Sequence, residues 1–323
     1  MEEIIFHYGG KQIKCQGDKK QKIEEVCNKF CNQINMYINS FIFNHEGNEL
    51  NLNKTINEIA HENKIHIFVY EKNGKNEINC IYDKKEEEIN LLHDYNIELS
   101  RLSYYDINFY KEGGNNINEK NIELYINDKK VIFCNKYKSD EKGEIKVKFK
   151  FKKLITSTHD MFTYCSSLKS IDFSFFNSSK VKDMGFMFYD CSSLKSIDLS
   201  PLDTSNVTNM NGLFLKCTSL ESINISSFNT SKVINMNNMF GYCESLKSID
   251  LSSFNTKKVN DMGLMFISCS SLISIDLSSF DISNCCEIGK IFSDCSILSK
   301  DNIRIKNSSK RILNEFKKIK KQN

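Results

Sequence analysis

The 323-residue sequence is short of several features that would assign it to a functional class. It has no tryptophan and a single proline, and no apolar run in it approaches the roughly 18 residues that a membrane-spanning helix needs. Its first residues lack the basic start and long apolar stretch of a secretory signal, so we expect a cytoplasmic protein. The charge is nearly balanced, with 44 basic and 41 acidic side chains, which argues against nucleic acid as a partner.

Thirteen cysteines stand out against this composition. In a reducing compartment cysteines are normally free thiols, so we expect no disulfide framework. A zinc site would need tightly spaced Cys-x-x-Cys pairs with histidine partners, and the sequence has none. The sequence therefore predicts neither a metal nor another cofactor.

A phenylalanine recurs every 26 residues in the second half of the chain, and a cysteine follows each one three positions later. The phenylalanines are Phe162, Phe188, Phe214, Phe240, Phe266 and Phe292. The cysteines are Cys165, Cys191, Cys217, Cys243, Cys269 and Cys295. A constant period without insertions is typical of a solenoid, in which each unit buries its apolar side chains against the next unit. The favoured role of the cysteines is a buried row of small side chains.

One unit, which begins at Cys191, reads CSSLKSIDLSPLDTSNVTNMNGLFLK. Ile197 and Leu199 alternate as in a strand, and the Asp203-Thr-Ser-Asn segment has the chemistry of a turn. Residues 161–298 resemble the BspA-type leucine-rich repeats. The resemblance implies an extended β-solenoid, and many members of that family are surface or adhesion proteins. After the last unit, Ile312, Leu313, Phe316 and Ile319 share one face of a predicted basic capping helix.

The first seventy residues follow a different pattern. Strand-like segments at Ile4–Tyr8 and Lys11–Cys15 flank Gly9-Gly10, and a helical pattern covers Lys22–Asn35. Phe41–Phe43 and Ile65–Tyr70 read as further strands. Residues 1–72 thus resemble a ubiquitin-like β-grasp domain. The resemblance implies a protein-binding patch at Ile42, His66 and Phe68, whereas the Leu-Arg-Gly-Gly tail needed for conjugation is missing.

Residues 76–160 give the weakest pattern. Ile78–Tyr82, Ile122–Ile126 and Ile145–Phe151 alternate like strands, and Gly113–Asn116 reads as a turn. We expect a small β-rich region whose last strand, 144–151, lies against the first repeat as an N-terminal cap.

A second row of side chains follows the same 26-residue period, on the exposed side of the predicted strand. It consists of Asp172, Asp198, Asn224, Asp250 and Asp276. Adjacent parallel strands lie about 4.8 Å apart, so this row could present an acidic face to a protein partner. It could also hold Ca²⁺, although calcium requires about six or more converging oxygens. A solvated stripe balanced by Lys169, Lys195 and Lys247 is the third interpretation.

No catalytic group emerges from the repeats, because none of them carries a histidine near the serines that flank the aspartate row. The sequence therefore predicts an α+β chain with four parts. These are an N-terminal β-grasp domain (1–72), a small β-rich region with the N-terminal solenoid cap (76–160), a leucine-rich-repeat-like β-solenoid of 26-residue units (161–306) and a basic C-terminal capping helix (307–323).

The expected function is a non-enzymatic scaffold or adaptor that binds protein partners of unknown identity, with ubiquitin-pathway proteins as candidates for the first domain. The alternative is a surface adhesion protein that reaches the cell surface by an unconventional route.

Overall fold

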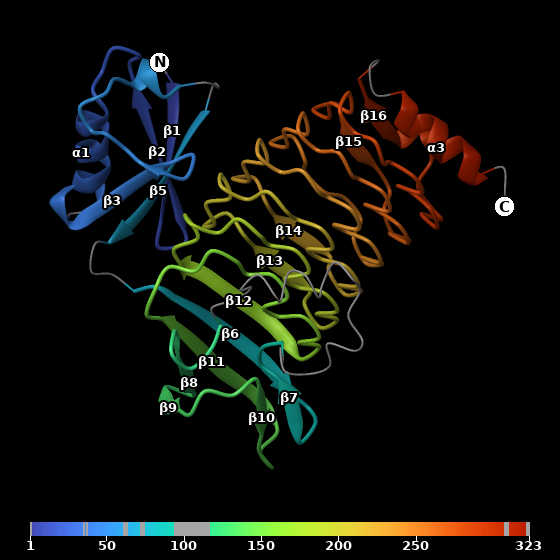
Figure 1. Cartoon of the computed structure of the whole chain (residues 1–323), viewed down its shortest axis with the longest axis horizontal. Helices are drawn as coiled ribbons and strands as arrows, with labels where there is room; N and C mark the ends of the chain where they lie inside the picture. Colours follow the sequence, from blue (N-terminus) through green and yellow to red (C-terminus); the bar gives the residue numbers. More distant parts are fainter. Residues whose placement is uncertain are drawn as a thin grey trace.

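The computed structural model describes most of the chain (Figure 1). The described residues are 2–34, 36, 38–60, 64–71, 75–93, 117–306 and 310–320. Within them, no helix combines the length and the apolar character required to cross a membrane.

A five-stranded mixed sheet with one helix forms the N-terminal domain. Its elements are β1 (Glu2–Tyr8), β2 (Lys11–Gly17), α1 (Ile23–Gln33), β3 (Phe41–His45), β4 (Asn48–Glu49) and β5 (Lys64–Glu71), with single 3₁₀ turns at Ile38–Ser40 and Ile56–Glu58. The strand order is β2-β1-β5-β3-β4, and β1 is parallel to β5. This arrangement is β-grasp-like.

The predicted hairpin and helix are confirmed. Tyr8 pairs with Lys11 across a two-residue turn in which Gly9 and Gly10 have φ values of 55° and 73°, a conformation that glycine adopts without strain. The apolar side of α1, with Phe30 fully buried, packs on Phe6 of β1 at a ring distance of 4.6 Å. The other side of the sheet, with His7, is the side available to the rest of the molecule.

A second sheet connects this domain to the repeats. Its strands lie in the order β12-β6-β11-β8-β9. They are β6 (Glu77–Lys84), β8 (Ile122–Ile126), β9 (Lys129–Val131), β11 (Gly143–Phe151) and β12 (Leu168–Phe175), and a separate pair consists of β7 (Glu88–Asn90) and β10 (Lys136–Lys138). The turn expected at residues 113–116 lies outside the described residues.

The cap differs from the prediction in one respect. Residues 144–151 pack against the first repeat, as predicted, but the strand that pairs with β12, the strand of the first repeat, is β6. β11 lies one position further out and contributes rings: Phe149 is 6.0 Å from Phe162, and Phe151 is 5.2 Å from Phe176. The hydrophobic core therefore continues from the sheet into the repeats without a break.

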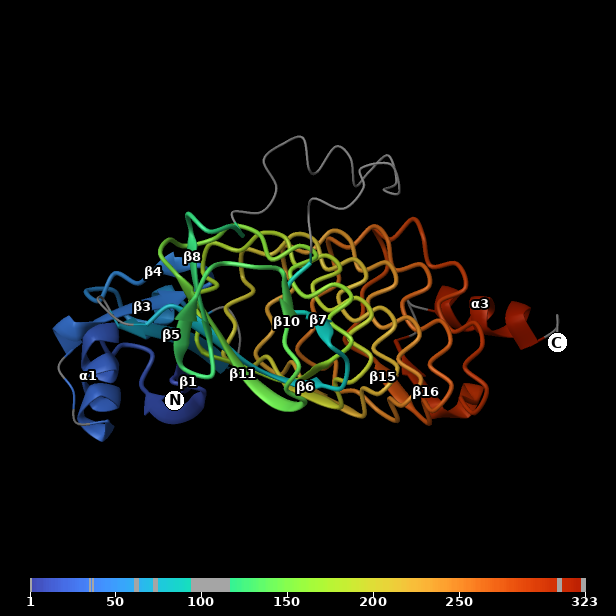
Figure 2. The same cartoon turned by 90° about the horizontal axis from the view of Figure 1, so that it is seen from below.

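The repeats stack in a row from the second sheet to the C-terminal helix (Figure 2). Two parallel ladders hold the coils together. The strand ladder includes β13 (Ser196–Asp198) with β14 (Ser222–Asn224) and β15 (Ile275–Leu277) with β16 (Ile303–Ile305). The second ladder consists of single bridges at Ser157, Asp183, Asn209, Asn235, Asp261 and Glu287.

The phenylalanines of the 26-residue period form one continuous stack inside the coils. Neighbouring rings from Phe162 to Phe292 lie 5.4 to 5.8 Å apart and nearly parallel. The array ends at a 3₁₀ turn (Lys300–Asn302), β16 and α3 (Arg311–Lys320). Ile312 of α3 is fully buried against the core, so this helix covers the last coil. The side chains of Phe316 and Ile319 lie outside the described part.

Candidate binding cleft and the polar ladders of the repeats

The predicted row of aspartates lies on the exposed side of the strand ladder, one residue per coil. In every coil the side chain oxygen accepts a hydrogen bond from the backbone N–H two residues later, at 2.8 to 3.2 Å. The donors are Ser174, Ser200, Ser226, Ser252 and Ser278. These are Asx turns, which change the direction of the chain where the strand ends. Asn224 makes the same turn as its aspartate neighbours, so the turn does not require the charge.

The negative charge is stabilised at one member of the row, Asp276. Hydrogen bonds from Ser278 lower the pKa of Asp276, and Arg304 lies 3.9 Å from its carboxylate. The row therefore places one exposed aspartate or asparagine side chain on this face in each coil.

Two further Asx ladders run along the coils, of which the sequence indicated only the turn at Asp203. One consists of Asn177, Asp203, Asn229, Asn255 and Asp281. The other consists of Asp183, Asn209, Asn235 and Asp261. Each coil therefore turns at up to three corners by the same chemistry. The signal was present in the sequence, because Asp or Asn recurs at these positions with the 26-residue period.

Hydroxyl groups form another ladder between coils. Ser178 Oγ donates to the Asp203 carbonyl at 3.2 Å and accepts from the Asp203 N–H at 2.8 Å. Thr204, Thr230 and Thr256 make the same pair of bonds to the coil that follows. These hydroxyls satisfy backbone groups that the turns would otherwise leave without partners.

The cysteine row is buried and consists of free thiols. Each thiol from Cys191 onward donates to the carbonyl of the phenylalanine 29 residues earlier, at 3.0 to 3.2 Å. Burial raises the pKa of the Cys217 thiol. The thiols are therefore polar links between coils as well as small core side chains.

This arrangement predicts which thiols react. All thirteen cysteines lie among the described residues, and Cys286 alone is exposed. We expect an alkylating reagent at neutral pH to modify Cys286 first and the half-buried Cys134 more slowly, because thiolates are scarce where burial disfavours them. Mass spectrometry of the labelled chain checks this. Rapid labelling of Cys217 or Cys243 before unfolding would contradict the buried ladder.

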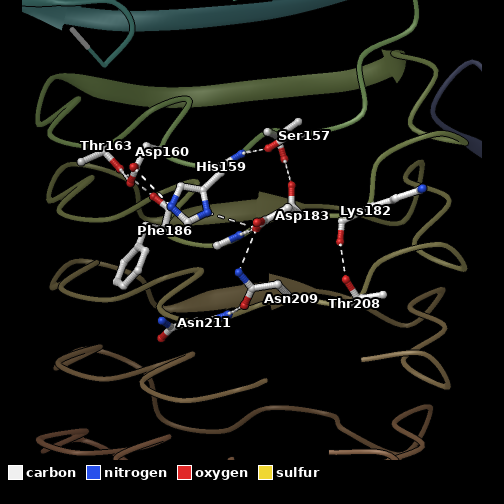
Figure 3. A network of polar contacts seen from close by, with 12 residues as sticks. Ser157, His159, Asp160, Thr163, Lys182, Asp183, Phe186, Thr208, Asn209 and Asn211 are labelled. Atoms are coloured by element: carbon white, nitrogen blue, oxygen red, sulfur yellow. Dashed lines mark hydrogen bonds and ion pairs between the residues drawn. The ribbon is translucent and has the colours of Figure 1, made fainter. Parts of the chain in front are cut away.

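A polar network closes the N-terminal end of the repeats (Figure 3). The buried ring of His159 lies with Nδ1 3.1 Å from Asp183 Oδ1 and with Nε2 3.4 Å from Asp160 Oδ2. Asn209 also donates to Asp183 Oδ1, at 3.0 Å. A Cβ at Gly185 would come within 2.8 Å of the His159 ring, so glycine is required for this close approach.

The geometry of this network is structural. Ser157 Oγ accepts the backbone N–H of His159 at 3.1 Å, and the ring is held by carboxylates of its own and the next coil. The pairing of His159 with Asp183 joins residues 24 positions apart, so no short motif indicates it. The 26-residue period would have indicated this pairing, because His159 stands one period before Gly185, and Asp183 is two residues before Gly185.

The predicted patch on the N-terminal domain lies on β3 and β5. Ile42 and His66 are half-buried, while Phe68 is only 5 % exposed. His66 and Phe68 face the repeats and lie in a cleft with Asp250 of the aspartate row. Ile42 does not line this cleft. The structure thus brings together members of two separately predicted sites.

The cleft has a volume of about 540 Å³ and lies between the N-terminal domain and three consecutive coils. The domain contributes the ionisable side chains His45, Glu46 and His66 together with apolar Ile59, Ile65 and Phe68. The repeats contribute Phe228, Asp250 and a set of serine and asparagine side chains. Among the described residues, His, Cys, Asp and Glu side chains do not gather in groups of three or more that could hold a metal ion.

Comparison with curated proteins finds no match. The model of one family, described as "Mycoplasma protein of unknown function, DUF285", matches residues 133–223 and 195–307. The two matches together extend from the second sheet through the last coil and cover more than half of the chain. The chain therefore belongs to this family of repeat-containing proteins.

Proposed function

We propose that the protein is a non-enzymatic scaffold that binds a protein partner through the aspartate row on the exposed strand face. The observation that carries the proposal is the geometry of that row. Carboxylates at Asp172, Asp198, Asp250 and Asp276 lie on one exposed face at a fixed spacing, held by hydrogen-bonded turns. Solenoids commonly bind partners through such repeated surfaces.

The chemistry of the row favours a partner with basic side chains. Exposed charges that face a complementary partner accelerate association and orient the complex. Lys169 beside Asp172 is occupied by an ion pair with Glu144, so it does not neutralise the row at its N-terminal end. The resemblance to BspA-type repeats supports the same interpretation, since it implies an extended solenoid with an accessible face.

Neutralisation of the row tests the proposal. In the fourfold variant Asp172→Asn, Asp198→Asn, Asp250→Asn, Asp276→Asn, each turn should persist, because Asn224 already makes it. We expect the variant to keep its unfolding transition and to bind the partner captured by the wild-type chain at least about tenfold more weakly, with the loss greatest at low salt.

The matched control is Asp261→Asn with Asp281→Asn. It removes one carboxylate from each of the two other Asx ladders, in which other coils already have asparagine at the same position. This control should bind as the wild type does. Equal capture by all three proteins would refute a role for the row.

The N-terminal domain is proposed to act as a fixed ubiquitin-like module rather than a conjugated one. Its patch at Ile42, His66 and Phe68 would bind ubiquitin-pathway proteins when the domain moves off the repeats, because Phe68 is only 5 % exposed against them. Ile42→Ala with Phe68→Ala should abolish that binding. Unchanged partners in the double variant would remove this part of the proposal.

A surface adhesion protein is the second candidate, favoured by the resemblance to BspA-type repeats. We propose a cytoplasmic location for the scaffold and the cell surface for the adhesion protein. Protease treatment of intact cells separates the two candidates, since it removes only a protein that is exposed on the surface.

A further inference from the structure

The N-terminal sheet is enclosed between two different partners. α1 covers one side, and the first coils of the repeat array cover the other (Figure 1). Asn206 donates to the Gly47 carbonyl across this contact at 3.2 Å. Polar groups and rings, rather than a continuous apolar core, therefore hold the domain on the repeats; the two hydrophobic cores remain separate.

Two histidines lie at the centre of this contact. His7 Nε2 is 2.8 Å from His66 Nδ1, so one ring donates a hydrogen bond and the other accepts it. The ring of His7 also stacks on Phe68 at 4.6 Å. Ser200 and Pro201 of the repeats share a small cavity with His7, which is only 5 % exposed although it lies on the side of the sheet away from α1.

We propose that His7 and His66 form a pH-sensitive clasp, which keeps the N-terminal domain on the repeats at neutral pH and releases it on mild acidification, exposing Phe68. The clasp requires an accepting nitrogen on one of the rings, because two imidazolium rings have only donors to offer each other. A charged His7 in the closed contact would also lose its hydration.

The direction of the effect follows from the pKa values. Burial, and next the neighbouring His66, lower the pKa of His7 from 6.5 to about 3 in the closed form. An exposed His7 in the open form regains the ordinary value, so the open form binds the proton more readily. The closed form is fully favoured above pH 6.5, and each pH unit below it shifts the equilibrium toward the open form by up to about tenfold.

Other ionisable groups surround the clasp and limit the pH window. Those on the domain are Lys11, His45, Glu46 and Tyr70, and those on the repeats are Asp203, Asp250 and Lys232. Burial raises the pKa of Asp203, so its protonation favours the closed state as the pH falls and opposes release of the domain. Release should therefore occur between about pH 6.5 and pH 5, where histidines titrate and most carboxylates remain charged.

The absence of tryptophan from the chain gives a direct assay. Phe68→Trp introduces a single indole at the contact, and its emission should shift to the red as the pH falls from about 7.5 to about 5. Adding His7→Phe keeps the aromatic stack but removes the titrating group, and should abolish the shift. Adding His93→Gln, a histidine outside the contact, should leave it intact.

The wild-type chain provides a second readout that does not depend on the variants folding. Amide hydrogen exchange in β1 and β5, corrected for the intrinsic pH dependence of exchange, and the radius of gyration from X-ray scattering should both rise as the pH falls over the same range, while the circular dichroism stays constant. Constant exchange, constant dimensions and an unshifted emission would each overturn the clasp, as would a shift that survives His7→Phe. The result does not depend on whether the aspartate row binds a partner.

Discussion

Phe214→Ala is expected to lower the free energy of unfolding of the repeat array by about 3 to 5 kcal/mol, the usual cost of truncating a fully buried ring. Phe214 has no exposed surface and is stacked between Phe188 and Phe240, at ring distances of 5.4 and 5.7 Å. Its removal leaves a cavity in the middle of the stack, and the coils on both sides cannot close it without breaking their ladders.

Denaturant unfolding followed by circular dichroism measures this loss. Tyr242→Ala is the control, because Tyr242 stands two residues after Phe240 and is 36 % exposed. That substitution should cost less than about 1 kcal/mol, as surface changes usually do. If Phe214→Ala were no more destabilising than Tyr242→Ala, the phenylalanine stack would not be the core of the array.

The phenylalanine stack could be predicted because, in a solenoid, side chains at equivalent positions of successive coils have equivalent neighbours. Each of the phenylalanines meets the same neighbours one period away, so a period read from the sequence is also a list of contacts. The same reasoning predicted the buried cysteines and the exposed aspartate row. It missed the hydrogen bond from each thiol to a carbonyl 29 residues earlier, which depends on how one coil is rotated on the next.

Contacts between unlike parts of the chain could not be predicted in this way. The position of β6 beside β12, in place of β11, depends on the pairing of antiparallel strands distant in the sequence. Nothing in the alternation of Ile78–Tyr82 distinguishes it from that of Ile145–Phe151. Phe68 is buried although it belongs to neither hydrophobic core, and it lines the cleft together with residues of the repeats. Neither periodicity nor a motif in the sequence predicts this contact.

Ser178→Ala is expected to destabilise the array by about 2 to 4 kcal/mol, although it removes a single oxygen atom. Ser178 is fully buried, and its hydroxyl bonds both the N–H and the carbonyl of Asp203, which is 1 % exposed. Without the hydroxyl these two backbone groups lose a partner in a place that water does not reach. Each buried polar group left unpaired costs about 1 to 3 kcal/mol.

Ser227→Ala is the matched control, since it makes the same chemical change at another buried serine of the array. Ser227 is 4 % exposed, and its Oγ has no hydrogen-bond partner among the described residues. Its removal should therefore be neutral or slightly stabilising, because burying an unpaired hydroxyl is itself unfavourable. The measurement is the urea concentration at the midpoint of unfolding, compared between each of the two variants and the wild type. Equal midpoints for Ser178→Ala and Ser227→Ala would mean that the hydroxyl ladder does not hold the coils together, and that the stacked rings and backbone bridges alone do so.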